Sequence, residues 1–508
     1  MNRRQKSQAA TAVVGNSTAA APTAGQGKLR RELRLFGVIG FSVGSMSPAA
    51  ALALNGVAPA GLVGRAVAVA FLFSAIGVFF VAYGFIRLSQ HVAHAGSVYA
   101  FTGLTLGSRA GFFSGWALLG TYMITVPAGF AVVGLFGQDF LVQSGIWPGA
   151  NWLTIGLIAA AVVWAFAAGA VRMTGRSLVV LEFVTVALII GLMIVILFKV
   201  AGGHGPSGEP SLTLSVFKLP PGIPLSAIGL AAVFGFLSFS GFEASATLGE
   251  ETANPRRNIP RALFFAVVGT GVLLVLGMAI ESLGFGATVA GSKAFATSSS
   301  PLGDLAKMYV GTPMADLLNL GATISAFGAT LGIAAAGSRL FLAMARDGTS
   351  SKYLTHISPR TGAPTGPLTV VMTLALAILL ILWGIGVTAT NLFFYLGTIA
   401  TLSLLVAYIL VNVGAIKFLF IDARRVGRWE VFMPVLGIAF LAYTLYRQVV
   451  PVPAAPYKFF PYVVVAYLLI GAALVIGVPG MAARVGIGLA RSEGLEIASE
   501  NAVEPTGS

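Results

Sequence analysis

The stretch from Gly235 to Glu251 places polar, chemistry-bearing side chains in an apolar setting. It reads GFLSFSGFEASATLGEE, so serines, glycines and the carboxylate of Glu243 interrupt a run long enough to cross a bilayer. An unpaired backbone group is costly in hydrocarbon, so such a break persists only where protein or a water-filled cavity covers it. A carboxylate within a membrane span marks a candidate functional site. A kinked, packed helix and a binding site at an unwound helix both remain open interpretations.

A second break of the same kind lies near the first apolar span. Residues 40–48 read GFSVGSMSP, again small, hydroxylated and ending in a helix-breaking proline. Interrupted spans at corresponding places in two halves of a chain are typical of the binding sites of transporters. The pair of breaks therefore favours a substrate site between two spans.

Composition indicates an all-α integral membrane protein. The chain is 57% hydrophobic and only 9% charged, whereas soluble proteins are about a quarter charged. Its net charge of +14 does not indicate a nucleic-acid partner, because 24 of the 31 Lys and Arg residues fall on one side of the predicted spans. The positive-inside rule places both termini in the cytoplasm, as in a multi-pass protein of the plasma (inner) membrane. With no cysteine, disulfides and thiolate metal sites are excluded.

The elements that must position the two breaks are membrane spans of about 20 apolar residues. Twelve are predicted, at residues 35–58, 62–88, 111–136, 152–171, 177–200, 225–248, 262–285, 314–345, 368–385, 392–420, 431–450 and 460–478. The predicted organisation is a disordered cytoplasmic tail (1–34), a first repeat (35–200), an extracellular connection (201–224), a second repeat (225–420), two further spans (421–479) and a cytoplasmic tail (480–508). Because each repeat holds five spans, the second repeat must be inverted relative to the first.

Three separated motifs stand out along the chain. They are the run 236–259, the run from Ser338-Arg339 to Arg346-Asp347-Gly348, and Ala95-Gly96-Ser97-Val98-Tyr99 followed by Gly115-Trp116. Together they resemble the amino acid/polyamine/organocation (APC) permeases. The resemblance extends in the same order from about Leu35 to Phe420. It implies the five-plus-five inverted repeat of the LeuT-like or APC fold with two extra helices, and a substrate held near the midplane between the first and sixth spans.

The resemblance also implies how an amino acid would bind. The amides of Gly44, Ser45 and Met46 and the Ser45 hydroxyl would meet the carboxylate, as the free donors of a half-helix allow. Gly44 and Gly241 would permit close backbone approach. Carbonyl oxygens at both breaks would meet the ammonium, and two aromatic rings would close over the ligand or simply pack. The implied substrate-binding set is Ser42, Val43, Gly44, Ser45, Met46, Leu237, Phe239, Ser240, Gly241 and Phe242.

Two carboxylates are candidates for proton coupling. Glu182 lies in the fifth span, at a place where some proton-coupled relatives carry a lysine, and burial in apolar surroundings would favour its neutral form. A permanent pair with an arginine is the alternative. Glu243 follows the same logic, with recognition of a cationic substrate as a third possibility. Glu281, near the outer end of the seventh span, ranks lower because it is expected to reach water. Weaker candidates for a sodium site are the hydroxyls of the eighth span, Thr323, Ser325 and Thr330.

The leading hypothesis is a proton-coupled secondary transporter of an amino acid or related amine that works by alternating access. No nucleotide-binding loop is present, and no cofactor is expected. An obligate exchanger, and a transport-dead membrane sensor or scaffold, remain alternatives. An enzyme is disfavoured, because the polar groups gather at helix breaks without a nucleophile, base and orienting group. The expected partners are the small-molecule substrate, a proton or sodium ion, and the lipid bilayer.

Overall fold

The chain folds into a helical bundle in a computed structural model that describes residues 33–91, 97–169, 175–206, 212–248, 252–348, 351–422, 425–478 and 480–492. The expected disorder of the N-terminal tail concerns residues that lie almost wholly outside these ranges. Residues 95 and 96 of one family motif and residues 249–251 of another also lie outside them.

Helices make up nearly all of the described chain. In order they are α2 (Leu35–Met46), α3 (Pro48–Leu54), α4 (Val57–Val63), η1 (Gly64–Ala66), α5 (Val67–Ser89), α6 (Ser97–Leu106), α7 (Ser108–Gln143), α8 (Trp152–Ala167), α9 (Gly175–Ala201), η2 (Leu214–Phe217), α10 (Ser226–Ser238), η3 (Phe242–Leu248), α11 (Pro255–Gly284), α12 (Val289–Thr297), α13 (Pro301–Tyr309), α14 (Thr312–Gly348), α15 (Thr365–Gly384), α16 (Ala389–Ile416), η4 (Lys417–Ile421), η5 (Arg428–Val431), α17 (Phe432–Arg447), η6 (Tyr457–Phe459), α18 (Phe460–Gly477) and α19 (Met481–Ser492).

Eleven helical segments of the described chain are long and apolar enough to cross a membrane. Each coincides with one of the predicted spans. The remaining predicted span, residues 152–171, corresponds to α8, which is apolar but has only 16 residues. The multi-pass, all-helical class is thereby confirmed, while the number twelve and the inverted repeat stay predictions.

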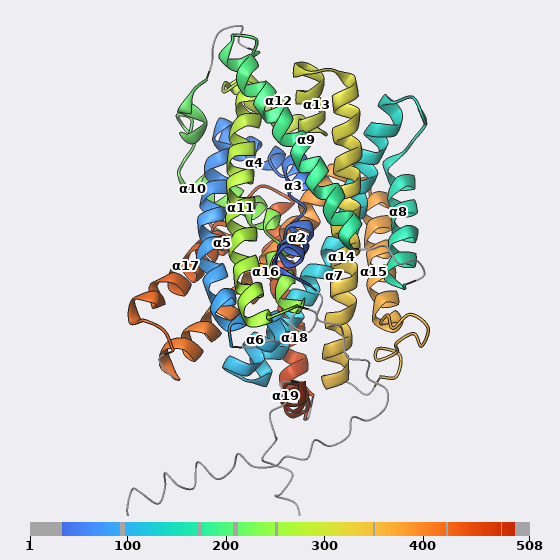
Figure 1. Cartoon of the computed structure of the whole chain (residues 1–508), viewed down its shortest axis with the longest axis vertical. Coiled ribbons are helices and arrows are strands. Elements are labelled where there is room, and N and C mark those ends of the chain that lie inside the picture. The colour runs from blue at the N-terminus through green and yellow to red at the C-terminus, as the bar shows by residue number, and fades with distance from the viewer. Residues whose placement is uncertain are drawn as a thin grey trace, which may run out of the picture.

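Short helices lie at both ends of the bundle. Figure 1 shows most helices running along the long axis, with α12 and α13 at one end and α6 and α19 at the other. None of these four was predicted, because a short helix at a membrane surface lacks the apolar run of about 20 residues that identifies a span. Helix α19 buries Met481 and Val485 against the bundle and packs on α14 and α7.

Two groups of helices pack around the interrupted spans. In one group α11 packs against α5, α2 and η3, and in the other α7 packs against α14 and α16. Small residues allow the close approach that holds membrane helices together. A Cβ atom on Gly129 of α7, for example, would lie 2.0 Å from the Thr330 hydroxyl oxygen on α14.

A backbone contact joins the chain before α2 to the chain before α11. The amide of Ala253 donates to the carbonyl oxygen of Leu33 at 2.9 Å, and Leu33 and Thr252 form an isolated parallel bridge. The starts of the first and seventh spans are therefore linked at the end of the bundle predicted to be cytoplasmic.

Candidate functional site

The first span breaks at Ser47, between α2 and α3. Ser47 has φ 50° and ψ 61°, and Pro48 begins α3, a position where proline sacrifices no helical hydrogen bond. The hydroxyl oxygens of Ser47 and Ser325 on α14 are 2.5 Å apart. The first free amide of α3, that of Ala49, donates to a Glu182 carboxylate oxygen on α9 at 3.0 Å. A buried carboxyl therefore caps the positive end of this half-helix.

The sixth span breaks between α10 and η3, at Gly241. Gly241 has φ 100°, a conformation that favours glycine. Its amide donates to Glu243 at 3.1 Å, and the carboxylate also accepts from the hydroxyls of Tyr408 at 2.6 Å and Tyr122 at 3.4 Å. Glu243 is fully buried. It is satisfied by three donors and, within the described residues, has no ion-pair partner.

The two breaks touch each other. The Ser42 hydroxyl donates to the carbonyl oxygen of Phe242 at 2.9 Å, and a Cβ atom on Gly241 would lie 2.8 Å from the carbonyl oxygen of Ser45. Gly44 differs, because a Cβ atom there would meet only a methyl group of Val179, at 3.7 Å. Close backbone approach in this conformation depends on Gly241 and not on Gly44.

The predicted binding set surrounds this junction with unequal exposure. Buried members are Ser42, Met46, Phe239, Gly241 and Phe242, and partly exposed members are Val43, Gly44, Ser45, Leu237 and Ser240. The ring of Phe242 packs on Phe85 and Tyr408, with centroids 5.2 and 5.3 Å away. In this conformation both predicted aromatic residues are therefore packed side chains.

The amides expected to receive a carboxylate lie inside α2. Gly44, Ser45 and Met46 form its last turn, so their amides are directed back into the helix. The Ser45 hydroxyl donates to the Phe41 carbonyl at 2.8 Å. The groups without helical partners in a last turn are carbonyl oxygens. Carboxylate binding by these amides would require α2 to unwind by about one turn, whereas the present conformation offers acceptors for an ammonium group.

The hydroxyls proposed for sodium have separate roles. Thr323 and Thr330 each donate to the backbone carbonyl four residues earlier, at 2.7 Å, as hydroxyls in membrane helices commonly do. Ser325 alone among the three reaches the first span, through Ser47.

Sequence reasoning missed the two tyrosines that bind Glu243. Tyr122 lies on α7 and Tyr408 on α16, and both are almost fully buried. A single tyrosine in an apolar span has the pattern of ordinary packing, so only the spatial position of Glu243 identifies them. Through them the carboxylate of the sixth span is bonded to the second group of helices.

Glu281 corrects an expectation from the sequence. It was placed near water because it lies three residues from the end of α11, at Gly284. Instead its side chain is fully buried. Leu305 of α13 faces Gly284 at the end of α11, and Figure 1 shows α12 and α13 at this end of the bundle.

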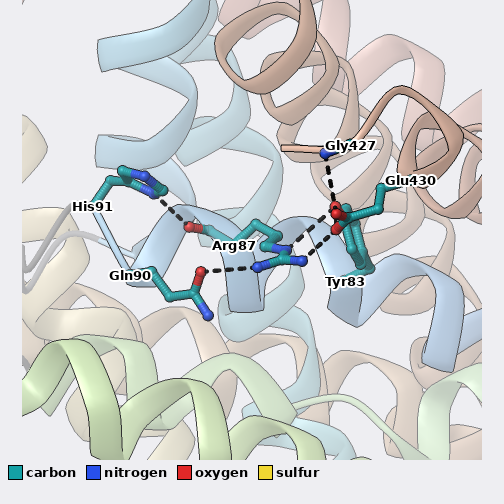
Figure 2. A network of polar contacts seen from close by, with 6 residues as sticks. All are labelled: Tyr83, Arg87, Gln90, His91, Gly427 and Glu430. Atoms are coloured by element: carbon teal, nitrogen blue, oxygen red, sulfur yellow. Dashed lines mark hydrogen bonds and ion pairs between the residues drawn. The ribbon is translucent and has the colours of Figure 1, made fainter. Parts of the chain in front are cut away.

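A further polar network lies at the opposite end of the bundle. Figure 2 shows Tyr83 and Arg87 on α5 meeting Glu430 on η5. The Glu430 carboxylate pairs with the Arg87 guanidinium and accepts from the Tyr83 hydroxyl at 2.5 Å. Its other oxygen accepts from the Gly427 amide at 3.2 Å. This cluster ties the end of α5 to the start of α17.

Comparison with solved structures defines the fold class. A crystal structure of a mutant manganese transporter of Eremococcus coleocola matches with a TM-score of 0.53 and 13% sequence identity, covering 94% of this chain and 98% of that one. At that identity the likeness concerns the fold alone.

The sequence then identifies the family. The family model for amino acid permeases matches residues 33–474, so the chain belongs to the amino acid permease family. The branched-chain amino acid permease BcaP of Bacillus subtilis is 26% identical over 68% of this chain and 73% of its own length. The low-affinity putrescine importer PlaP of Escherichia coli is 24% identical over 80% of this chain and 84% of its own length. The chain is a transporter and not an enzyme.

Proposed function

We propose that this chain is a secondary active transporter that moves an amino acid or related amine across the plasma membrane by alternating access, driven by protons. The observation that carries the proposal is the junction of two interrupted spans. At each break a backbone amide donates to a buried carboxyl, Glu182 in the first span's break and Glu243 in the sixth span's break. Relatives named as amino acid and putrescine transporters support the substrate class.

This conformation favours binding of the substrate's ammonium group over binding of its carboxylate. The free amides after each break already bind a protein carboxylate, whereas the last turn of α2 presents carbonyl oxygens with partial negative charge. We propose that an amine binds between Gly44, Ser45 and the break of the sixth span. The larger binding set named from the sequence lines the same junction.

The two carboxyls link helices that alternating access would move apart. Glu182 joins α9 to α3, and Glu243 joins η3 to α7 and α16. A proton on either carboxyl removes the charge that holds the cap and weakens its charge-assisted bonds. Proton binding would then favour separation of the helices, which is the requirement for coupling.

The test is uptake by purified protein in liposomes, with a labelled panel of amino acids and amines under a proton gradient, a sodium gradient or neither. Glu182→Gln keeps an acceptor for the Ala49 amide but cannot carry a proton, so it should lose proton-driven accumulation and retain counterflow. Asp422→Asn, at an exposed carboxylate, is the matched control and should behave as wild type. Full proton-driven accumulation by Glu182→Gln would refute the role of Glu182.

The same panel separates the alternative functions. Counterflow without net uptake by the wild type would indicate an exchanger. Absence of both for every compound would support a sensor or scaffold. The cytoplasmic position of the termini, inferred from the distribution of Lys and Arg, can be checked by protease accessibility of tags in oriented vesicles.

A further inference from the structure

Glu281 is a buried carboxyl that the site at the helix breaks does not use. Its side chain is fully buried, and neither carboxylate oxygen has a hydrogen-bond partner in the part of the chain that the structure describes. Glu182 and Glu243, in contrast, each accept a backbone amide. Of these three buried carboxyls, Glu281 therefore has the surroundings least suited to a negative charge.

Apolar side chains pack against α11 on either side of Glu281. One turn before it, Gly277 faces Leu52 of α3 and Met193 of α9, and nearly one turn after it, Gly284 faces Leu305 of α13 and Ile196 of α9. The Tyr309 hydroxyl of α13 donates to the Gly284 carbonyl at 2.8 Å and is thus engaged elsewhere.

The charged groups on the packed elements do not compensate Glu281. Arg65 on η1 donates to the carbonyl oxygens of Ser215 and Ala287. On the elements packed against α11 at this end of the bundle, the other charged groups occupy exposed positions, namely Lys199 on α9, Lys218 after η2, Lys293 on α12, and Asp304 and Lys307 on α13. Farther away, Asp139 on α7 and Asp316 on α14 are partly exposed. Glu182 and Glu243 are held at the helix breaks, and Arg87 on α5 pairs with Glu430 at the opposite end.

A pocket lies just beyond Glu281, on the side predicted to be extracellular. It has a volume of about 880 Å³ and is lined in part by Phe285, Thr288, Asp304 and Lys307. Phe285 follows Glu281 by one helical turn and stacks on Phe295 of α12, with ring centroids 5.0 Å apart and planes 13° apart. Phe285 therefore lines the pocket while its stacking partner Phe295 is buried.

An ionised Glu281 is incompatible with this packing. Burying an unpaired charge is strongly unfavourable, so a carboxyl in such a place either binds a cation or becomes neutral. A metal ion would need several oxygen ligands, and the side chains that face Gly277 and Gly284, about one turn on either side of Glu281, are leucine, isoleucine and methionine. A proton needs no other ligand.

We propose that Glu281 is a second proton-binding site, which takes up a proton from the outer pocket when Phe285 and Phe295 separate and retains it when they close. The proposal rests on the proposed function in its coupling role, because a proton captured on the outer side can contribute to driving uptake. It differs from the sites at the breaks, since Glu281 makes no hydrogen bond to either interrupted span within the described residues.

The first test measures protonation without transport. Infrared spectra of the purified protein at neutral pH should contain the carbonyl band of a protonated carboxyl in an apolar environment, and Glu281→Gln should lose that band. Glu281→Met, which is also neutral, provides a second variant if the glutamine variant does not fold. Asp304→Asn, at an exposed carboxylate of the pocket rim, is the matched control and should retain the band.

The second test measures coupling in liposomes. Each proton required for uptake makes the rate change about tenfold per pH unit where protons are limiting. Glu281→Gln should lower the slope of log uptake against external pH by about one, and lower the proton-to-substrate ratio by about one. Uptake by Asp422→Asn, at an exposed carboxylate outside the pocket, should follow the wild-type slope.

The outcomes separate the two proposals. A missing carbonyl band in the wild type, or an unchanged band in both Glu281 variants, would overturn the proton site whatever transport shows. An unchanged slope and proton ratio in Glu281→Gln would overturn its coupling role. A band lost with Glu281, together with no proton-driven uptake of any compound by wild type, would support the proton site and refute the proposed function.

Discussion

Replacing Gly241 with alanine tests the contact between the two breaks most directly. The new Cβ atom would lie 2.8 Å from the Ser45 carbonyl oxygen, at a residue with φ 100°. The unfavourable backbone conformation costs about 1–3 kcal/mol, and forcing a methyl group into packed backbone costs about 1–3 kcal/mol more. Gly241→Ala should therefore disfavour the closed junction by roughly 2–6 kcal/mol.

Gly44→Ala is the matched control at the opposing break. Its Cβ atom would make an ordinary contact of 3.7 Å with Val179, and alanine is about 1 kcal/mol better than glycine inside a helix. Because the added methyl group would meet only Val179 and leaves in place the backbone carbonyl oxygens proposed to bind the amine, the variant should bind substrate as wild type does. The comparison isolates steric contact from the general effect of replacing a glycine.

The assay is equilibrium binding of the best substrate to purified protein, with size-exclusion profiles as the check of folding. A loss of 2 kcal/mol corresponds to about a thirtyfold weaker affinity. Wild-type affinity in Gly241→Ala would contradict the contact between the breaks. Equal damage in Gly44→Ala would mean that the functional conformation has α2 unwound, with Gly44 close to the ligand as the sequence predicts.

Three further predictions concern the polar contacts. Tyr408→Phe should lower the free energy of unfolding by about 1–3 kcal/mol. The decrease should exceed that caused by Tyr122→Phe, because the Tyr408 hydroxyl lies 2.6 Å from the Glu243 carboxylate and the Tyr122 hydroxyl 3.4 Å. Equal decreases would argue against this geometry. Glu430→Gln should lower stability by up to about 1 kcal/mol in low salt, and a loss that persists at high salt would indicate packing instead of charge. Uptake by wild type and by Ser325→Ala should both be independent of sodium. If sodium stimulates uptake by wild type and not by Ser325→Ala, a cation site lies at Ser325.

Much of the fold was predictable because lipid imposes a simple rule on sequence. Long apolar runs must become helices, and eleven predicted spans coincide with helical segments of the described chain. The breaks are predictable too, since Pro48 has a fixed φ and no amide hydrogen, whereas Gly241 can adopt a positive φ that other residues avoid. The exact position of the break in the first span, at Ser47, coincides with a hydroxyl contact to Ser325 on α14, which the sequence does not reveal.

The partners within the site could not be read from the sequence. Tyr122 and Tyr408 come from helices far apart in the chain, and nothing local distinguishes them from packing residues. Glu281 was misjudged for a related reason, because distance from a helix end measures exposure only if no other element covers that end. In each case the missing information is the long-range packing of one helix on another.

The bond between the Ala253 amide and the Leu33 carbonyl involves backbone atoms alone. Most substitutions at either position therefore leave its donor and acceptor in place, and proline at position 253 is the exception because it removes the donor. Neutral mutations can alter side chains around this bond while the connection between the first and seventh spans persists. The linkage is thus robust to sequence drift in a way that the side-chain bonds of Glu182, Glu243 and Glu430 are not.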